Sequence, residues 1–293
     1  MPADGSILRT PAQLATAAAG CAAAFVGVLA VAYGSEQAER IDAAAVEDFG
    51  RPLREPLLAR AAVEISRMAD PQPFAMAAVA LAVIGLLLYG SREAAAVAVM
   101  IGGANIATQV LKPVLATPRG TVGGWSIGPE AFPSGHATAA MSLALAAVFV
   151  SRRRWRPLVG LAGAGFAVAV GFSLVAIDAH FPSDVAGGYL MAAGWCFGTQ
   201  AGLAAAERRW PRANRAVDDE GGAPHRVALV LLGGLTVAAA VGATQLPELV
   251  DYARGHTAFA VVAAATAALA ALLVAVGVVS GRPAPSRTPP VAS

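Results

Sequence analysis

The sequence predicts an all-α fold: a polytopic membrane helical bundle with a six-helix core and two additional C-terminal transmembrane helices. Of the 293 residues, 57% are hydrophobic and only 14% are charged, whereas about a quarter of the residues in a soluble domain are charged. The mean hydropathy is +0.61. The apolar residues also gather into eight runs without Asp, Glu, Lys or Arg, each close to the ~20 residues that a helix needs to cross a bilayer.

We expect each run to be a membrane-spanning helix. The first run is long for a signal peptide, and Met1–Thr10 holds one Arg and one Asp rather than a basic cluster, so we expect an uncleaved helix there. Cys21 and Cys196 lie inside runs and are expected to be core residues rather than a disulfide. In chain order the runs are Ala12–Gly34, Pro71–Ser91, Ala94–Leu111, Ala131–Ser151, Pro157–Ile177, Val185–Ala206, Val227–Pro247 and Gly255–Gly281.

The segments between the runs divide the chain into four parts. We expect a six-helix membrane core over 1–206, a charged, Gly- and Pro-containing cytoplasmic linker over 207–225, two additional transmembrane helices over 226–281, and a disordered Pro-rich cytoplasmic tail over 282–293. The long 35–70 connection has mixed charges at helix-like spacing. It is either a helix at the membrane interface, partly covering a site, or a solvated connector.

The arginines predict the orientation. The short loop between the fourth and fifth runs reads SRRRWRP, and such a basic block belongs in the cytoplasm. Both termini are then cytoplasmic, and the loops 112–135 and 178–184 face the outside. Polar residues gather in these two outer loops.

Two cations follow the third run: Lys112, the only lysine of the chain, and Arg119 seven residues later. Either could simply extend toward the lipid headgroups. The turn Pro133-Ser134-Gly135 favours an anion site, because it leads into a helix whose unpaired N–H groups and dipole attract negative charge. His136 follows in the first turn, where it could donate a proton to a bound anion.

The second outer loop contains His180 and Asp184, four residues apart across a Pro-Ser turn. A carboxylate beside an imidazole fixes its tautomer and leaves the other ring nitrogen as a nucleophile or base. Alternatively, Ser183 or Asp184 only caps the next helix. Together, the loops predict phosphate binding and transfer through a phosphohistidine. No carboxylate cluster could hold Mg²⁺; a zinc site would leave the cations and the turn unexplained. We therefore expect no metal and no cofactor.

At these residues the sequence resembles the type 2 phosphatidic acid phosphatase family, membrane lipid-phosphate phosphatases that share a site with vanadium haloperoxidases. The family motifs are Lys-x6-Arg-Pro, Pro-Ser-Gly-His and Ser-Arg-x5-His-x3-Asp. Here they correspond to Lys112…Arg119-Gly120, Pro133-Ser134-Gly135-His136 and Ser173-Leu174…His180…Asp184. The resemblance covers the first six runs.

The resemblance implies a role for each matching residue. His180 would be the nucleophile, Asp184 would orient it, and His136 would protonate the leaving lipid oxygen. The phosphoryl oxygens would be held by Lys112, Arg119, Ser134 and Gly135. Two positions depart from the family pattern: Gly120 replaces a proline, and Leu174 replaces an arginine, which removes a bidentate phosphate contact. We expect Leu174→Arg to raise activity on a lipid monophosphate if the guanidinium can reach the site.

The predicted function is metal-independent dephosphorylation of a lipid phosphate or diphosphate at the extracytoplasmic face, with polyprenyl diphosphate, phosphatidate and phosphatidylglycerophosphate as fitting substrates. The alternatives are a phosphoryl or headgroup transferase acting on lipids, or a phospholipid-binding or transport protein with weakened catalysis. The expected partners are the bilayer and the lipid substrate, with no nucleic acid; the sequence does not predict an oligomeric state.

Overall fold

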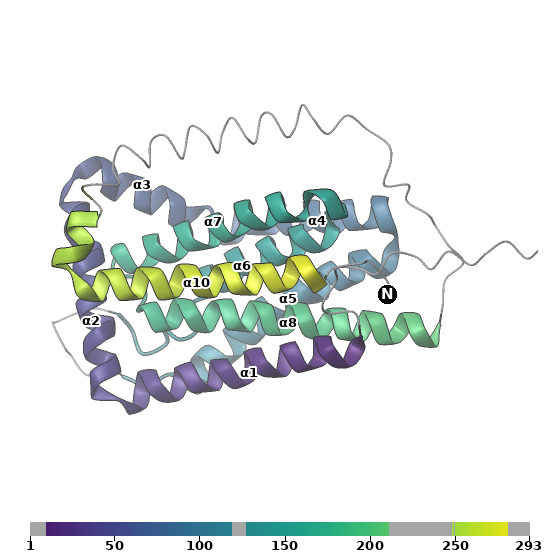
Figure 1. Cartoon of the computed structure of the whole chain (residues 1–293), viewed down its shortest axis with the longest axis horizontal. Helices are drawn as coiled ribbons and strands as arrows, with labels where there is room; N and C mark the ends of the chain where they lie inside the picture. The colour runs from purple at the N-terminus through teal and green to yellow at the C-terminus, as the bar shows by residue number, and fades with distance from the viewer. Residues whose placement is uncertain (1–9, 119–126, 211–247, 249, 281–293) are drawn as a thin grey trace, which may run out of the picture.

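The described part of the chain is a bundle of helices without a strand. The computed structural model describes residues 10–118, 127–210, 248 and 250–280. The prediction of an all-α fold is therefore confirmed. The elements are α1 (Pro11–Gly34), α2 (Glu36–Gly50), η1 (Arg51–Arg54), α3 (Pro56–Arg67), α4 (Pro71–Tyr89), α5 (Ser91–Leu115), α6 (Gly135–Val150), η2 (Arg153–Trp155), α7 (Arg156–Ala176), α8 (Pro182–Arg209) and α10 (Thr257–Ser280), and Figure 1 shows their arrangement.

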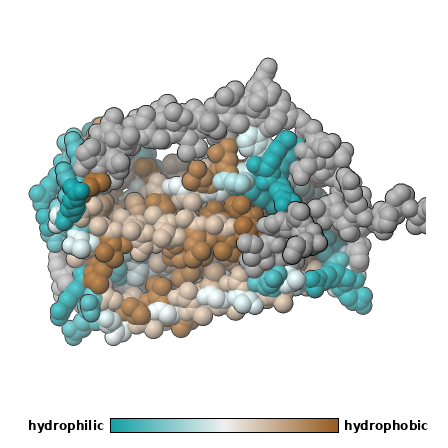
Figure 2. Space-filling view, in the orientation of Figure 1, coloured by the Kyte–Doolittle hydropathy of each residue, from teal (hydrophilic) through white to brown (hydrophobic). Residues whose placement is uncertain are grey.

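Seven of the eight predicted runs coincide with a helix, and the seventh run, 227–247, lies outside the described residues. Five of the described helices are long and apolar enough to cross a membrane: α1, α4, α5, α7 (with η2) and α10. An apolar band lies between hydrophilic ends in Figure 2. The protein is therefore a multi-pass membrane protein.

The sixteen-residue helix α6 lies at the centre of the bundle. Thirteen of its residues are buried, and it packs against α4, α5, α7, α8 and α10. Small residues allow this close packing: a Cβ at Gly163 of α7 would lie 2.9 Å from the Cβ of Ala144. A central helix positions its first residues at a defined place at one end of the bundle.

The 35–70 connection is helical, as one of the two alternatives predicts. It forms α2, η1 and α3, and α2 lies across the end of the bundle where α1 ends (Figure 1). Ala45 and Val46 are completely buried. Phe49 contacts Phe172 of α7 and Phe259 of α10, with ring centroids 5.2 and 4.7 Å apart. The segment is therefore attached by an apolar face of its own.

Helix α10 packs against α6, α7 and α8, and its first turn contacts α2. A Cβ at Gly160 of α7 would lie 2.8 Å from Val278 and 3.1 Å from Val274, which shows how closely α7 and α10 approach. The last predicted transmembrane helix thus lies directly on the core. The division at 206, 225 and 281 stays a prediction, because residues 211–247 and 281–293 lie outside the described part.

Candidate active site

A polar stripe on α5 carries the predicted phosphate-binding lysine. The Asn105 amide donates to Ser142 Oγ over 3.2 Å, and the Thr108 and Thr138 hydroxyls are 3.1 Å apart. Positions 105, 108 and 112 have the i, i+3, i+7 spacing of one helix face. Because the first two contact α6, Lys112 lies on the face of α5 that is turned toward α6, near the first residues of α6.

The predicted anion turn directly precedes α6. Ser134 is the N-cap of this helix and is completely buried, and its Oγ accepts from the N–H of Ala137 over 3.3 Å. Gly135 and His136 are the first two helical residues, so their N–H groups have no acceptor within the helix. The sequence Pro133-Ser134-Gly135 thus places two N–H donors at a positive helix end, as an anion site requires.

Two glycines of α8 bring this turn close to the His180 loop. A Cβ at Gly187 would lie 2.5 Å from the Phe132 ring, and one at Gly188 would lie 2.7 Å from the carbonyl oxygen of Ser134. The Ser134 N–H donates to the carbonyl oxygen of Asp184 over 2.9 Å. The second and third sequence motifs are therefore joined by direct backbone contact.

The His180 loop follows the end of α7. Asp178 has φ of +57°, the left-handed conformation that reverses the chain after a helix, and partial desolvation raises the pKa of its carboxyl group. The N–H groups of Ala179 and His180 then both bond to the carbonyl oxygen of Leu174, over 3.0 and 3.3 Å. These bonds hold His180 at the rim of the bundle.

The structure brings His180 and Asp184 together as predicted. His180 Nδ1 lies 3.5 Å from Asp184 Oδ2, and the two side chains are 10% and 0% exposed. Asp184 Oδ2 also accepts from the Phe181 N–H over 2.9 Å. Phe181 is the N-cap of α8, and its bond to Asp184, the third helical residue, is that of a capping box. Asp184 therefore both caps the helix and faces the imidazole.

A cavity of about 450 Å³ contains two of the predicted residues, Lys112 and His180. Its other lining residues are Gly128, Pro129, Glu130, Ala131 and Ala179. Lys112 interacts electrostatically with Asp184 and with Glu130. The cavity therefore holds a cation and an imidazole at the start of α8, a combination suited to a phosphate group.

The other predicted residues differ in how they are placed. Ser134 and Gly135 form the start of α6, and Arg119 lies outside the described residues. His136 does not line the cavity; its Nε2 lies 2.9 Å from Oδ1 of Asp70. No group of three or more His, Cys, Asp or Glu in the described part could hold a metal ion.

Leu174, at the position of the family's arginine, is only 2% exposed and belongs to the apolar core with Val170 and Val175. Its side chain is packed among apolar neighbours, while its carbonyl oxygen holds the His180 loop. An arginine here would have to leave the core to reach a phosphate. The expected gain of activity from Leu174→Arg therefore loses its structural basis.

Sequence reasoning missed four polar residues at the site. Glu130 lines the cavity, and a Cβ at Gly135 would lie 3.2 Å from Gln109 Nε2. Asp42 and Asp70 contact the loops of the two histidines. Gln109 could have been found from its position one turn before Lys112. The two aspartates gave no such signal, because they come from the distant 35–70 connection.

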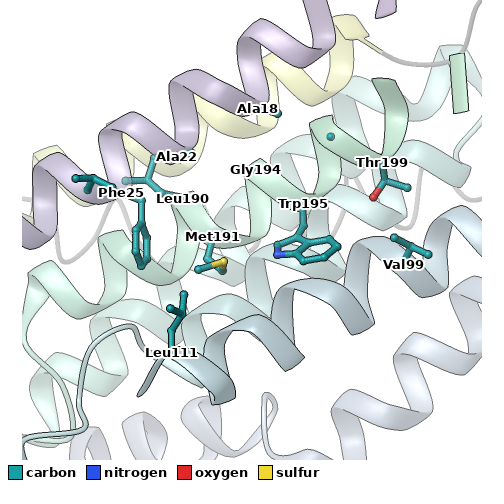
Figure 3. A pocket seen from close by; sticks show the side chains of 12 residues that line it. Ala18, Ala22, Phe25, Val99, Leu111, Leu190, Met191, Gly194, Trp195 and Thr199 are labelled. Atoms are coloured by element: carbon teal, nitrogen blue, oxygen red, sulfur yellow. The ribbon is translucent and has the colours of Figure 1, made fainter. Parts of the chain in front are cut away.

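An apolar groove begins one residue from Lys112. It has a volume of about 510 Å³, lies between α1, α5 and α8, and is lined by Leu111, Phe25 and Met191 toward the site and by Trp195, Ala18 and Thr199 further along (Figure 3). The Phe25 ring contacts the Phe132 ring, with centroids 5.1 Å apart. One residue of the groove wall therefore packs against the residue two positions before Ser134.

Residues 85–208 match the family model described as the PAP2 superfamily. This match includes all three sequence motifs and confirms the predicted resemblance to the type 2 phosphatidic acid phosphatases for this part of the chain.

A solved structure has a similar fold. It is described as the first transmembrane PAP2 type phosphatidylglycerolphosphate phosphatase from Bacillus subtilis. The identity is 18% and the TM-score 0.54, over 68% of this chain and 99% of that one. A search of the curated proteins found no significant match.

Proposed function

We propose that the protein dephosphorylates a lipid phosphate or diphosphate at the extracytoplasmic membrane face, without a metal ion and through a phosphohistidine on His180. The observation that carries this proposal is the cavity in which Lys112 and His180 lie together. Because His180 Nδ1 faces Asp184, Nε2 is the ring nitrogen left for attack on phosphorus.

The predicted site residues would supply each step of such a reaction. His180 Nε2 forms a bond to phosphorus while the bond to the lipid oxygen breaks, and His136 gives a proton to that oxygen. Lys112, Arg119 and the start of α6, with Ser134 and Gly135, stabilise the charge on the phosphoryl oxygens. Water then attacks the phosphohistidine, returns a proton to His136 and releases phosphate.

The apolar groove supports a lipid as the substrate. A lipid with its phosphate near Lys112 would have its chains beside Leu111, where the groove begins. The lining is almost entirely apolar, so a lipid chain that moves from the bilayer into the groove keeps an apolar environment. The groove fits phosphatidate, phosphatidylglycerophosphate and polyprenyl diphosphate alike, since each has an apolar chain next to its phosphate.

The two ends of α6 support the proposed orientation. The helix begins at the anion turn and ends at Val150, immediately before the loop with Arg152, Arg153 and Arg154. Its sixteen residues extend ~24 Å, so the site and the arginine block lie at opposite ends of the bundle. If the arginine block is cytoplasmic, this separation supports a site at the extracytoplasmic face.

The test is phosphate release by purified protein from these three lipids, with and without a chelator. We expect release that the chelator does not affect and that His180→Asn abolishes. His256→Asn is the matched control, because His256 lies before α10 and its Nδ1 contacts only the neighbouring carbonyl oxygen of Tyr252. Substantial release by His180→Asn, or zinc-restored activity after chelation, would contradict the proposal.

The same assay separates the alternative functions. A transferase would form product that depends on an added alcohol, and the phosphoryl or headgroup label would appear on that alcohol. A binding or transport protein would retain the labelled lipid without release, and His180→Asn would leave its retention unchanged. Either result would replace hydrolysis as the function of the site.

A further inference from the structure

We propose that the 35–70 segment is part of the catalytic site: Asp70 is the positioning residue of His136, and Asp42 is the positioning residue of the His180 loop. This inference rests on the proposed function. Both carboxylates contact a motif that carries a histidine, although neither belongs to the three motifs themselves. Asp70 and His136 are 66 residues apart in the sequence, and Asp42 and Ser183 are 141 residues apart.

The local sequence explains why the Asp70 carboxylate is available to His136. Asp70 is the N-cap of α4, where an aspartate ordinarily accepts from the N–H of the second or third helical residue. It makes no such side-chain bond here. The helix begins Pro71-Gln72-Pro73, so its third residue has no N–H to offer. The carboxylate instead lies 2.9 Å from His136 Nε2.

This contact selects the atom through which His136 can act. With Nε2–H donated to Asp70, only Nδ1 remains to transfer a proton to the substrate. The negative carboxylate stabilises the doubly protonated ring, which gives its Nδ1 proton to the lipid oxygen as the bond from phosphorus breaks. The neutral ring still donates Nε2–H to Asp70, and the attacking water later returns the proton to Nδ1.

Asp42 acts on the other histidine motif. It lies on α2 and is 7% exposed, and its carboxylate accepts from the Ser183 hydroxyl over 2.6 Å and from the Ser183 N–H over 3.3 Å. The N-cap of α8, Phe181, has no polar side chain, and Pro182 has no N–H. Asp42 therefore caps α8 from another helix and fixes the turn between His180 and Asp184.

The segment does not depend on these carboxylates for its attachment. Phe49 packs against Phe172 and Phe259, and the Asp48 carbonyl oxygen accepts from the Tyr252 hydroxyl. Replacing either carboxylate by its amide should therefore leave α2 and α3 in place. Asp42→Asn and Asp70→Asn test positioning rather than folding.

The test of Asp70 compares two leaving groups. Phosphatidate, or the lipid monophosphate hydrolysed in the panel above, leaves as an alkoxide that needs a proton, whereas nitrophenyl phosphate leaves as a stable phenolate. General acids contribute roughly 10²–10⁴-fold. We expect Asp70→Asn to lower kcat on the lipid by at least about 10-fold and on nitrophenyl phosphate by less than about 3-fold. Asp70→Asn should add no further loss to His136→Ala.

For Asp42 we expect equal losses on the two substrates rather than a larger loss on the lipid. The His180 loop serves attack on either substrate, so Asp42→Asn should lower kcat on both by the same factor, and Ser183→Ala should reproduce this loss without adding to it. The matched control is Glu64→Gln, which removes an exposed ion pair with Arg67 in the same segment and should leave both activities unchanged.

Three results would overturn this inference. Equal losses on both leaving groups for Asp70→Asn would show a merely structural contact, and raised activity would show that Asp70 withholds His136 from the reaction. Wild-type activity of Asp42→Asn would remove the second role. Failure of the proposed function is distinguishable, because His180→Asn would then retain phosphate release whatever the two aspartate variants do.

Discussion

His180 Nδ1 faces Asp184 Oδ2 at 3.5 Å across the first turn of α8, and both side chains are buried. The distance is longer than a hydrogen bond, while Asp184 Oδ2 accepts from the Phe181 N–H at 2.9 Å. The carboxylate is thus fixed by the backbone before it acts on the imidazole. A ligand that converts the neutral imidazole into the imidazolium would shorten this contact, because the imidazolium attracts the carboxylate more strongly than the neutral ring does.

The first prediction concerns the charge of Asp184. Asp184→Asn keeps an oxygen for the Phe181 N–H, so the fold should persist, but the imidazolium loses its counter-charge. We expect kcat to fall by roughly 10²-fold or more. Phosphate release and thermal unfolding in detergent measure the two effects. The control is Asp251→Asn, at an exposed ion pair with Arg254; near-wild-type kcat in Asp184→Asn would contradict the role of the pair.

The second prediction concerns the contact between α8 and the anion turn. Gly188→Ala would place a Cβ 2.7 Å from the Ser134 carbonyl oxygen, a backbone atom that cannot rotate away. We expect a loss of about 1–3 kcal/mol in the free energy of unfolding, with reduced phosphate release. Gly202→Ala is the matched control on the same helix, because nothing lies within 4 Å of its Cβ position; equal stability of the two variants would refute the close packing.

The third prediction concerns Leu174. Its side chain is 2% exposed, so Leu174→Arg would bury an unpaired charge, which typically costs several kcal/mol. We expect little folded protein, measured by size-exclusion chromatography in detergent. Leu174→Met should fold, since it conserves volume. A folded Leu174→Arg variant with higher kcat/KM would instead restore the expectation from the family motif.

The fourth prediction concerns the groove. Ala22→Trp places a large side chain on its α1 wall. We expect KM for long-chain lipids to rise at least several-fold while kcat/KM for nitrophenyl phosphate stays unchanged, because only the lipid chain needs that space. Leu161→Trp serves as the control, since Leu161 is 58% exposed on α7 outside the groove. Equal KM values for the lipid in Ala22→Trp and wild type would exclude the groove as the chain site.

The fifth prediction concerns topology. Cysteines introduced at Thr121 and Glu248 should react with an impermeant thiol reagent added to intact cells, and a cysteine at Asp219 should react only after lysis. The native Cys21 and Cys196 are buried and give a low background. The opposite labelling pattern would place the site in the cytoplasm.

The helical class and most of the helices can be predicted from the sequence, because a bilayer-spanning helix needs a long uncharged run and few other structures tolerate one. The sequence also predicts the residues of the anion turn and the His180–Asp184 pair, since each of these motifs is local: four consecutive residues in the first case and one helical turn in the second.

The distant residues that we add to the candidate site can be recognised only from the packing of the helices. In the sequence, Asp42 and Asp70 are indistinguishable from the other charged residues of a surface connection. Leu174 is recognisable there only as a residue that replaces the family's arginine. Their roles depend on where α2, α4 and α7 pack against α6 and α8. Such packing is fixed by apolar side chains and glycines spread over the whole chain, such as Phe49 and Gly188, so no local pattern of residues reports it.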